Sequence, residues 1–198
     1  MLSFGVMASG NGSNFLSVLK GIEEQNYPAV CSFLIVNNAS CGAARIAQEY
    51  GIPVFYISGK THPEIQEYEA ALLQIFKENP VDLLVLAGFM KKLPDSLIDL
   101  LPDRILNIHP ALLPKFGGKG FFGIHVHEAV IQAKEKESGA TVHLVTKQID
   151  GGKILSQVKV PVLESDTPEI LAARVLEQEH ALYLKTILEY AKKLKFLD

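Results

Sequence analysis

The feature that most constrains this chain is the alternation of short apolar runs with helix-like segments, which continues from the N-terminus to Pro110. Apolar runs typical of strands are followed by segments whose apolar residues recur at helical spacing. Such alternation predicts βαβ units, and therefore a mostly parallel central sheet with right-handed crossovers and helices on both faces. The expected strands are 2–7, 31–36, 53–57, 81–87 and 105–109, and the expected helices follow the loop 9–14 and cover 42–50 and 63–78.

The second half of the chain departs from this alternation. The runs 141–146 and 154–162 flank the turn sequence IDGGK at 149–153, which predicts an antiparallel extension of the sheet. Segment 168–193 has helical periodicity and predicts a long helix that packs back on the sheet. We expect one α/β domain over residues 1–198.

Charge and composition exclude several classes of protein. The 19 basic and 22 acidic residues give a net charge of −3, which argues against a nucleic-acid-binding face. The longest near-apolar run, 83–90, is too short to span a membrane. The cysteines, Cys31 and Cys41, have no metal-ligand spacing and form no disulfide framework. We therefore expect a cytoplasmic protein without a secretory leader.

The loop Ser9-Gly10-Asn11-Gly12-Ser13-Asn14 joins the first strand to the first helix. Glycines let the backbone approach a ligand, and a helix N-terminus offers unpaired N–H donors to an anion. A dinucleotide fingerprint does not fit, because Phe15 replaces the third glycine and Asn37 and Asn38 replace the acidic residue after the second strand. A single phosphate fits better, and the alternative is a simple turn in which Ser13 or Asn14 caps the helix.

A second candidate site lies at the end of the fifth strand. Asn107 and His109 are two residues apart and share one face of the strand, which stops at Pro110. Ligands of open α/β sheets bind outside the carboxyl ends of strands, so an amide and an imidazole are expected where substrates bind. A histidine with a purely structural hydrogen bond is the alternative, and Asp150 in a second glycine-rich loop favours chemistry instead.

Five segments resemble glycinamide ribonucleotide formyltransferases, which belong to the folate-dependent formyltransferase superfamily. They are SGNGSN at 9–14, LAGFMKKL at 86–93, LNIHPALLPKF at 106–116, IDGGKILSQ at 149–157 and QEH at 178–180. The resemblance implies a Rossmann-like formyltransferase fold with a phosphate-binding half, about 1–100, and a folate-binding and catalytic half, about 101–198. It implies transfer of the formyl group of 10-formyltetrahydrofolate to the amine of 5'-phosphoribosylglycinamide in de novo purine biosynthesis.

The resemblance also implies residue roles. Asn107 and His109 would donate hydrogen bonds to the oxyanion, while Asp150 would favour the protonated form of His109 and help to move the amine proton. Asn11, Gly12, Ser13 and Asn14 would bind the substrate phosphate, and Glu179 the ribose hydroxyls. Folate would be bound by Met90, Lys91, Lys92, Leu93, Asn107, Thr146, Lys147, Gln148, Ile149 and Asp150. Without the resemblance, Lys91 and Lys92 would be a solvated pair and Glu179 an exposed helical residue.

Further residues are left with alternatives. Of His125 and His127, we expect one to border the cleft and the other to start a helix; no partner motif supports a metal site. His143 is expected to be a hydrogen-bonding partner of the catalytic residues. The Gly/Phe-rich stretch 116–124 is expected to be a mobile loop near the site, and Ile65 stands where relatives carry a basic folate contact.

Two other functions compete with formyl transfer to the ribonucleotide. Formyltetrahydrofolate deformylase, a hydrolase, shares the Asn-x-His-Pro and Asp-Gly-Gly elements but usually has a further N-terminal domain. The related methionyl-tRNA formyltransferase normally carries a C-terminal RNA-binding domain. A non-catalytic nucleotide-binding module would not need Asn107, His109 and Asp150 together. The expected partners are the ribonucleotide and the formyl folate, with no metal, nucleic acid or membrane, in a monomer or homodimer.

Overall fold

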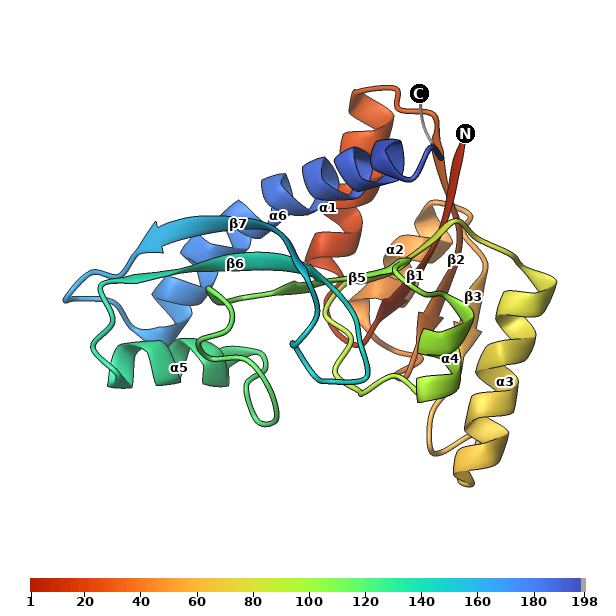
Figure 1. Ribbon diagram of the computed structural model, residues 1–198, viewed down its shortest axis with the longest axis horizontal. Helices are drawn as coiled ribbons and strands as arrows, with labels where there is room; N and C mark the ends of the chain where they lie inside the picture. The colour runs from red at the N-terminus through yellow and green to blue at the C-terminus, as the bar shows by residue number, and fades with distance from the viewer. Residues whose placement is uncertain (197–198) are drawn as a thin grey trace.

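The computed structural model describes residues 1–196 and contains one seven-stranded sheet. Figure 1 shows the sheet with the long C-terminal helix lying along it. The strands are β1 Leu2–Ala8, β2 Ala29–Val36, β3 Val54–Tyr56, β4 Leu83–Leu86, β5 Ile105–His109, β6 Glu137–Leu144 and β7 Ile154–Pro161. The helices are α1 Ser13–Glu24, α2 Gly42–Glu49, α3 Ile65–Glu78, α4 Asp95–Leu100, α5 Ile124–Gln132 and α6 Pro168–Lys193.

The strand order is β3-β2-β1-β4-β5-β6-β7. β1 to β5 pair in parallel, whereas β6 pairs antiparallel with β5 and with β7. The predicted parallel sheet with an antiparallel extension is thus confirmed. The order reverses between β1 and β4, and this switch point is where open α/β sheets bind their ligands.

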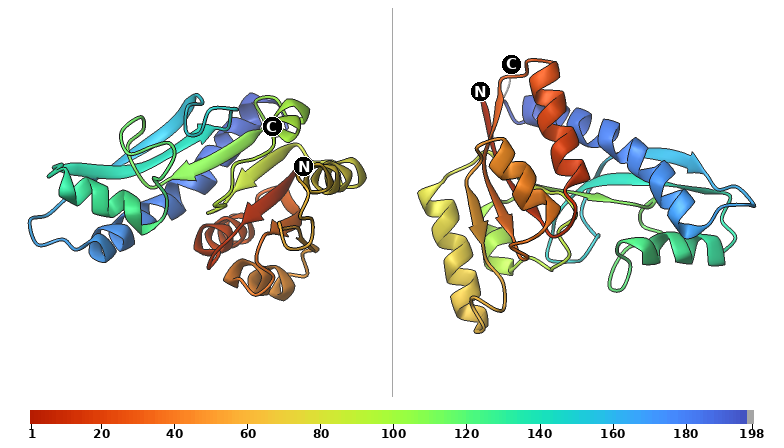
Figure 2. Two further views of the ribbon diagram at one scale, coloured as in Figure 1. Left: turned by 90° about the horizontal axis from the view of Figure 1, so that it is seen from below. Right: turned by 180° about the vertical axis from the view of Figure 1, so that it is seen from behind.

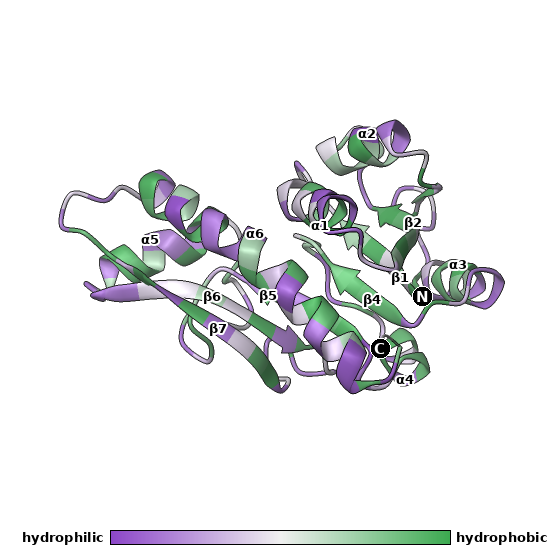
Figure 3. Ribbon diagram, turned by 90° about the horizontal axis from the view of Figure 1, so that it is seen from above, coloured by the Kyte–Doolittle hydropathy of each residue, from purple (hydrophilic) through white to green (hydrophobic). Residues whose placement is uncertain are grey.

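Helices cover both faces of the parallel part of the sheet (Figure 2). Buried residues of α1, α2 and α6 share one apolar cluster with β1, β2 and β4, and residues of α3 and α4 share a second cluster on the other face. Figure 3 shows that β1 and β4 are mainly hydrophobic, as strands covered on both faces must be. A third, smaller cluster joins α5 and α6 to β6 and β7.

The helix α6 joins the antiparallel part of the sheet to the helix α1, which covers the parallel part. Its residues pack against α1, α5, β6 and β7. Tyr183 on α6 is fully buried, and its hydroxyl lies 2.9 Å from the carbonyl oxygen of Leu86 and 3.0 Å from that of Leu106. These bonds fix α6 against the carboxyl end of β4 and the start of β5.

Several details differ from the predictions, and one of them is that β6 begins at Glu137 rather than at 141. Ile65, an apolar residue within the helix expected over 63–78, is 59% exposed, because it is the first residue of α3 and precedes the buried turns around Leu72 and Phe76. The short helix α4 was not predicted, since its six residues are too few to show a helical period.

Candidate active site

The candidate site is a cavity of about 580 Å³ at the carboxyl ends of β4 and β5. Asn14, Met90, Asn107, His109 and Asp150 all line it. Segments far apart in the sequence therefore meet at the predicted edge of the sheet. Other lining residues come from the loop 118–124, from α5 and from α6: Gly118, Lys119, Gly120, Phe121, Phe122, Gly123, Ile124, His127, Ala172, Leu176 and Glu179.

The glycine-rich loop after β1 is shaped by close contact with α2. Gly12 has a positive φ of 80°, and a Cβ there would lie 2.7 Å from the Cα of Ala43. Only glycine fits this combination of conformation and space. The loop also contacts the segment after β4, because the Ser9 hydroxyl accepts a hydrogen bond of 3.0 Å from the amide of Met90.

The first turn of α1 is available to an anion. Gly12 is the N-cap residue, and within residues 1–196 no side chain caps this helix. The alternative reading, in which Ser13 or Asn14 caps the helix, is therefore wrong. The uncapped N–H groups at this end of α1 and the positive end of the helix dipole suit a phosphate.

Asn14 and Glu179 form a buried pair between α1 and α6. The amide Nδ2 of Asn14 donates to Oε2 of Glu179 over 2.6 Å, and the two residues are 8% and 6% exposed. Among the described residues, the amide oxygen of Asn14 has no hydrogen-bond partner. Burial raises the pKa of Glu179 to about 7, against the lowering effect of the Asn14 amide. Glu179 is therefore buried, and the alternative that it is an exposed helical residue is wrong.

β5 brings Asn107 and His109 to the cavity, as their spacing predicts. In the antiparallel register, Asn107 faces His143 and His109 faces Thr141. His143 Nδ1 lies 2.9 Å from the carbonyl oxygen of Leu144 and must donate to it, so in the neutral ring Nε2 carries the lone pair. That nitrogen accepts from Asn107 Nδ2 over 3.1 Å, which leaves one N–H of the Asn107 amide for a ligand.

The Asp-Gly-Gly turn carries Asp150 into the same cluster. Asp150 itself has a positive φ of 53°, and a Cβ on Gly152 would collide with the backbone carbonyl of Leu144. The glycine lets the loop fold tightly against β6. Asp150 Oδ2 lies 3.7 Å from His109 Nδ1, and Oδ1 lies 3.5 Å from His143 Nε2.

The loop after β5 holds both catalytic candidates through its backbone. His109 Nε2 donates to the carbonyl oxygen of Phe116 over 2.7 Å, and the amide of Gly118 donates to Asp150 Oδ2 over 2.8 Å. The same loop reaches across the cavity, since a Cβ on Gly123 would lie 3.9 Å from Met90. Sequence analysis missed these contacts, because a main-chain donor or acceptor has no characteristic residue type.

Charge and burial act in opposite directions in this cluster. Burial lowers the pKa of His109 below its ordinary value, and the nearby His143 lowers it further. The Asp150 carboxylate and the Phe116 carbonyl raise the pKa of His109, but by less than burial lowers it. Asp150 therefore acts in the expected direction on His109, but burial outweighs it. Burial alone would raise the pKa of Asp150, yet His143 and His109, when their rings are protonated, and the amide of Gly118 lower it. Asp150 is a carboxylate at neutral pH.

Some of the other predicted binding residues line the cavity, and others do not. Met90, Lys91, Lys92, Leu93, Thr146, Gln148 and Ile149 line the cavity with Asn107 and Asp150. Lys147 does not line it, because its ammonium group pairs with Asp99 outside, at 2.8 Å. Of the phosphate-loop residues only Asn14 lines the cavity, while Asn11, Gly12 and Ser13 do not. His127 is buried and borders the cavity, whereas His125 is exposed and bonds Glu128.

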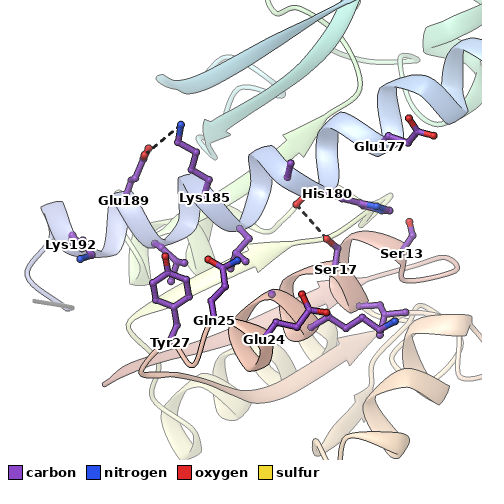
Figure 4. A pocket seen from close by; sticks show the side chains of 16 residues that line it. Ser13, Ser17, Glu24, Gln25, Tyr27, Glu177, His180, Lys185, Glu189 and Lys192 are labelled. Carbon is purple, nitrogen blue, oxygen red and sulfur yellow. Dashed lines mark hydrogen bonds and ion pairs between the residues drawn. The ribbon is translucent and has the colours of Figure 1, made fainter.

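A second hollow lies between α1 and α6, with a volume of about 940 Å³ (Figure 4). Ser13 lines one end of it, and the Ser17 hydroxyl there donates to the backbone carbonyl of His180. Its charged lining residues are Lys20, Lys185, Lys192, Glu24, Glu177 and Glu189, so neither sign of charge dominates. This groove shares no lining residue with the cavity that holds Asn107, His109 and Asp150.

Among residues 1–196, no group of three or more His, Cys, Asp or Glu side chains is arranged so that it could hold a metal ion. No helix there combines the length and the apolar character that crossing a bilayer requires.

Comparison with known proteins identifies the family. Residues 3–187 match the model of the formyl transferase family. The chloroplastic phosphoribosylglycinamide formyltransferase of Arabidopsis thaliana is 42% identical over 92% of this chain, and the chain spans 63% of that protein's length. The Escherichia coli phosphoribosylglycinamide formyltransferase is 33% identical over 90% of the chain and 82% of its own length.

Solved structures agree with this assignment. Glycinamide ribonucleotide transformylase 1 from Symbiobacterium toebii superposes with a TM-score of 0.90 at 34% identity, covering 98% of this chain and 89% of its own. A formyltetrahydrofolate deformylase from Pseudomonas syringae has a TM-score of 0.84 at 22% identity, covering 94% of this chain and 60% of its own, and shows a shared fold alone. This chain belongs to the formyl transferase family and, within it, to the phosphoribosylglycinamide formyltransferases.

Proposed function

We propose that this protein transfers the formyl group of 10-formyltetrahydrofolate to the amine of 5'-phosphoribosylglycinamide, in the pathway of purine biosynthesis. One observation carries the proposal: Asn107, His109 and Asp150 meet in one cavity that also contains the buried Asn14–Glu179 pair. A donor pair and a carboxylate suit acyl transfer, and the uncapped helix beside them suits a phosphate ester.

The reaction joins the amine nitrogen to the formyl carbon and breaks the bond from that carbon to the folate nitrogen. A negative charge develops on the formyl oxygen in between. The free N–H of the Asn107 amide is the first donor to that oxygen. The second donor is the Nε2–H group of His109. It becomes free for the formyl oxygen when the substrate displaces the Phe116 carbonyl, to which this group otherwise donates.

Asp150 moves the proton in this proposal. The amine loses one proton and the leaving folate nitrogen gains one, so the two transfers balance. The lowered pKa keeps Asp150 ionised, so its carboxylate, which is 11% exposed, can accept a proton from the ammonium group that forms on attack, directly or through water, and then deliver it to the folate nitrogen. His143 supports this role, because it lies 3.5 Å from Asp150 and also orients Asn107.

The substrates take opposite sides of the cavity. We assign the phosphate to the N-terminus of α1, with Asn11, Gly12, Ser13 and Asn14, and the ribose hydroxyls to Glu179. The folate ring system is assigned to the segments 90–93 and 146–150, without Lys147. Residues 1–100 would then supply most of the phosphate site, and residues 101–198 most of the chemistry. For a protein with two buried free cysteines, a reducing cytoplasm is the proposed location, and a monomer or homodimer stays a prediction.

The test is a comparison of folate release with and without the amine. Purified protein is mixed with 10-formyltetrahydrofolate, and the folate absorbance is followed before and after glycinamide ribonucleotide is added. Release that requires the ribonucleotide supports the transferase. Release at the same rate without it would instead assign the deformylase, and no release in either case would favour the non-catalytic module.

The variant Asp150→Asn keeps the shape of the side chain and removes its charge. We expect kcat to fall by at least about 100-fold, because proton transfer by a positioned group contributes on that order. The KM values of both substrates should change far less than kcat does. The exposed Asp103, outside the cavity, offers the control Asp103→Asn, which should be fully active. An active Asp150→Asn enzyme would contradict the assigned role.

A further inference from the structure

His127 is a buried histidine at the cavity that the proposed mechanism does not use. It lies on α5, is only 4% exposed and lines the cavity. Its Nδ1 atom is shielded from solvent and has no hydrogen-bond partner among residues 1–196. A buried polar atom without a partner costs about 1–3 kcal/mol, so a histidine with only a packing role would be a poor choice there.

The charge state of His127 limits the chemical groups that its ring can bind. Burial, together with the nearby His109, lowers its pKa to about 4. At neutral pH the ring is therefore uncharged and has one N–H donor and one lone pair. Such a ring suits an amine or amide, which can both donate and accept, better than a phosphate or a carboxylate.

The packing of α5 shows which side of the cavity His127 faces. Val130 lies three residues further along α5, on the same helix face, and packs with Leu171 and Val175 of α6. Ala172 and Leu176, the neighbours of those two residues, line the cavity with His127, as does Glu179 one turn later. His127 therefore borders the side of the cavity nearest α6, which is the side assigned to the ribonucleotide.

We propose that His127 binds the glycinamide group of the ribonucleotide through a hydrogen bond from its uncharged ring. This contact would hold the amine beside His109 and Asp150. The inference rests on the proposed function, and it adds a substrate-binding residue from α5 to those on α1, β5 and α6.

The test measures ligand binding rather than turnover alone. In His127→Phe a planar aromatic ring remains, but both nitrogens are removed. We expect calorimetric titration with glycinamide ribonucleotide to show affinity reduced by about 5- to 30-fold, the loss of one or two hydrogen bonds in a buried site. Titration with tetrahydrofolate should stay within about twofold of wild type. The exposed His125, on the same helix, gives the control His125→Phe, for which both affinities should be normal.

Two conservative variants identify the nitrogen involved and keep the test valid if His127→Phe does not fold. The side-chain amide of His127→Asn lies near the position of Nδ1, and that of His127→Gln near Nε2. One of the two should bind the ribonucleotide at least about threefold more tightly than the other. Equal affinities of these variants, or equal loss of both ligands in His127→Phe, would overturn the proposal. A wild-type protein that neither binds the ribonucleotide nor transfers the formyl group would instead overturn the proposed function.

Discussion

The variant Glu179→Gln tests how strongly the stability of the fold depends on the protonation of Glu179, which is buried against Asn14. The pKa of the Glu179 carboxyl rises from an ordinary 4.5 to about 7 on folding. An acid with a raised pKa in the folded state stabilises the fold through its bound proton. That stabilisation is fully present below pH 4.5 and is lost as the pH rises through about 7.

The magnitude follows from the two pKa values. Each tenfold change in proton affinity corresponds to about 1.4 kcal/mol, so the wild-type protein should lose about 3 kcal/mol of stability between pH 4.5 and 8 from this group alone. Glutamine does not titrate, and its side-chain oxygen can still accept from the Asn14 amide. The free energy of unfolding of Glu179→Gln minus that of wild type should therefore rise by about 3 kcal/mol over the same range.

Urea unfolding followed by circular dichroism at several pH values measures this difference. The exposed Glu177, on the same helix, provides the matched control Glu177→Gln, which leaves the buried Asn14–Glu179 pair intact. Curves for wild type and Glu179→Gln that stay parallel to within about 1 kcal/mol would refute the argument that burial of this carboxyl governs the pH dependence. The variant should also bind the ribonucleotide about tenfold more weakly, because a carboxylate accepts stronger hydrogen bonds from hydroxyls than an amide does.

The remaining predictions concern α6 and the loop after β5. Tyr183→Phe removes the hydroxyl that bonds two buried carbonyls, so thermal denaturation should show a loss of about 1–2 kcal/mol, and an unchanged melting temperature would contradict the role of this bond. Gly118→Ala and Gly120→Ala place the same strain at φ values of 93° and 94°, with no atom within 4 Å of either new Cβ. Alanine keeps the backbone N–H, but of these two positions only residue 118 donates that N–H to Asp150, so only in Gly118→Ala should the strained backbone weaken this bond, raise the pKa of the carboxylate and move the acid limb of the pH–rate profile to higher pH. The same shift in both variants would mean that loop strain, rather than this bond, sets the profile.

Much of the fold followed from local patterns. The strands of the parallel half, the antiparallel extension and the helix 168–193 were all predicted, because each is long or strongly patterned. The helix α4 and the exposure of Ile65 were not, since six residues show no period and the first residue of a helix can point away from the core. Which helix covers which face depends on contacts between distant segments, and periodicity alone does not encode these.

Of the candidate site, too, the sequence predicted one part and not the other. Residue type and spacing identified Asn107, His109 and Asp150, and the structure places them together around His143. The position of Lys147 was not predictable, because its ion pair with Asp99 joins residues 48 apart in the sequence. The contacts of the Phe116 carbonyl and the Gly118 amide were not predictable either, since every residue except proline has both groups.

The sequence by itself determined the chemistry available to this protein: a glycine loop before a helix, an amide and an imidazole on one strand face, and a carboxylate in a glycine turn. These are local properties, set by residue type and by spacing along the backbone. Only the tertiary structure decided that Glu179 is buried against Asn14, that burial outweighs Asp150 in its effect on His109, and that His127 faces the cavity. Burial and electrostatic coupling depend on distances through space, and those distances exist only once the chain has folded.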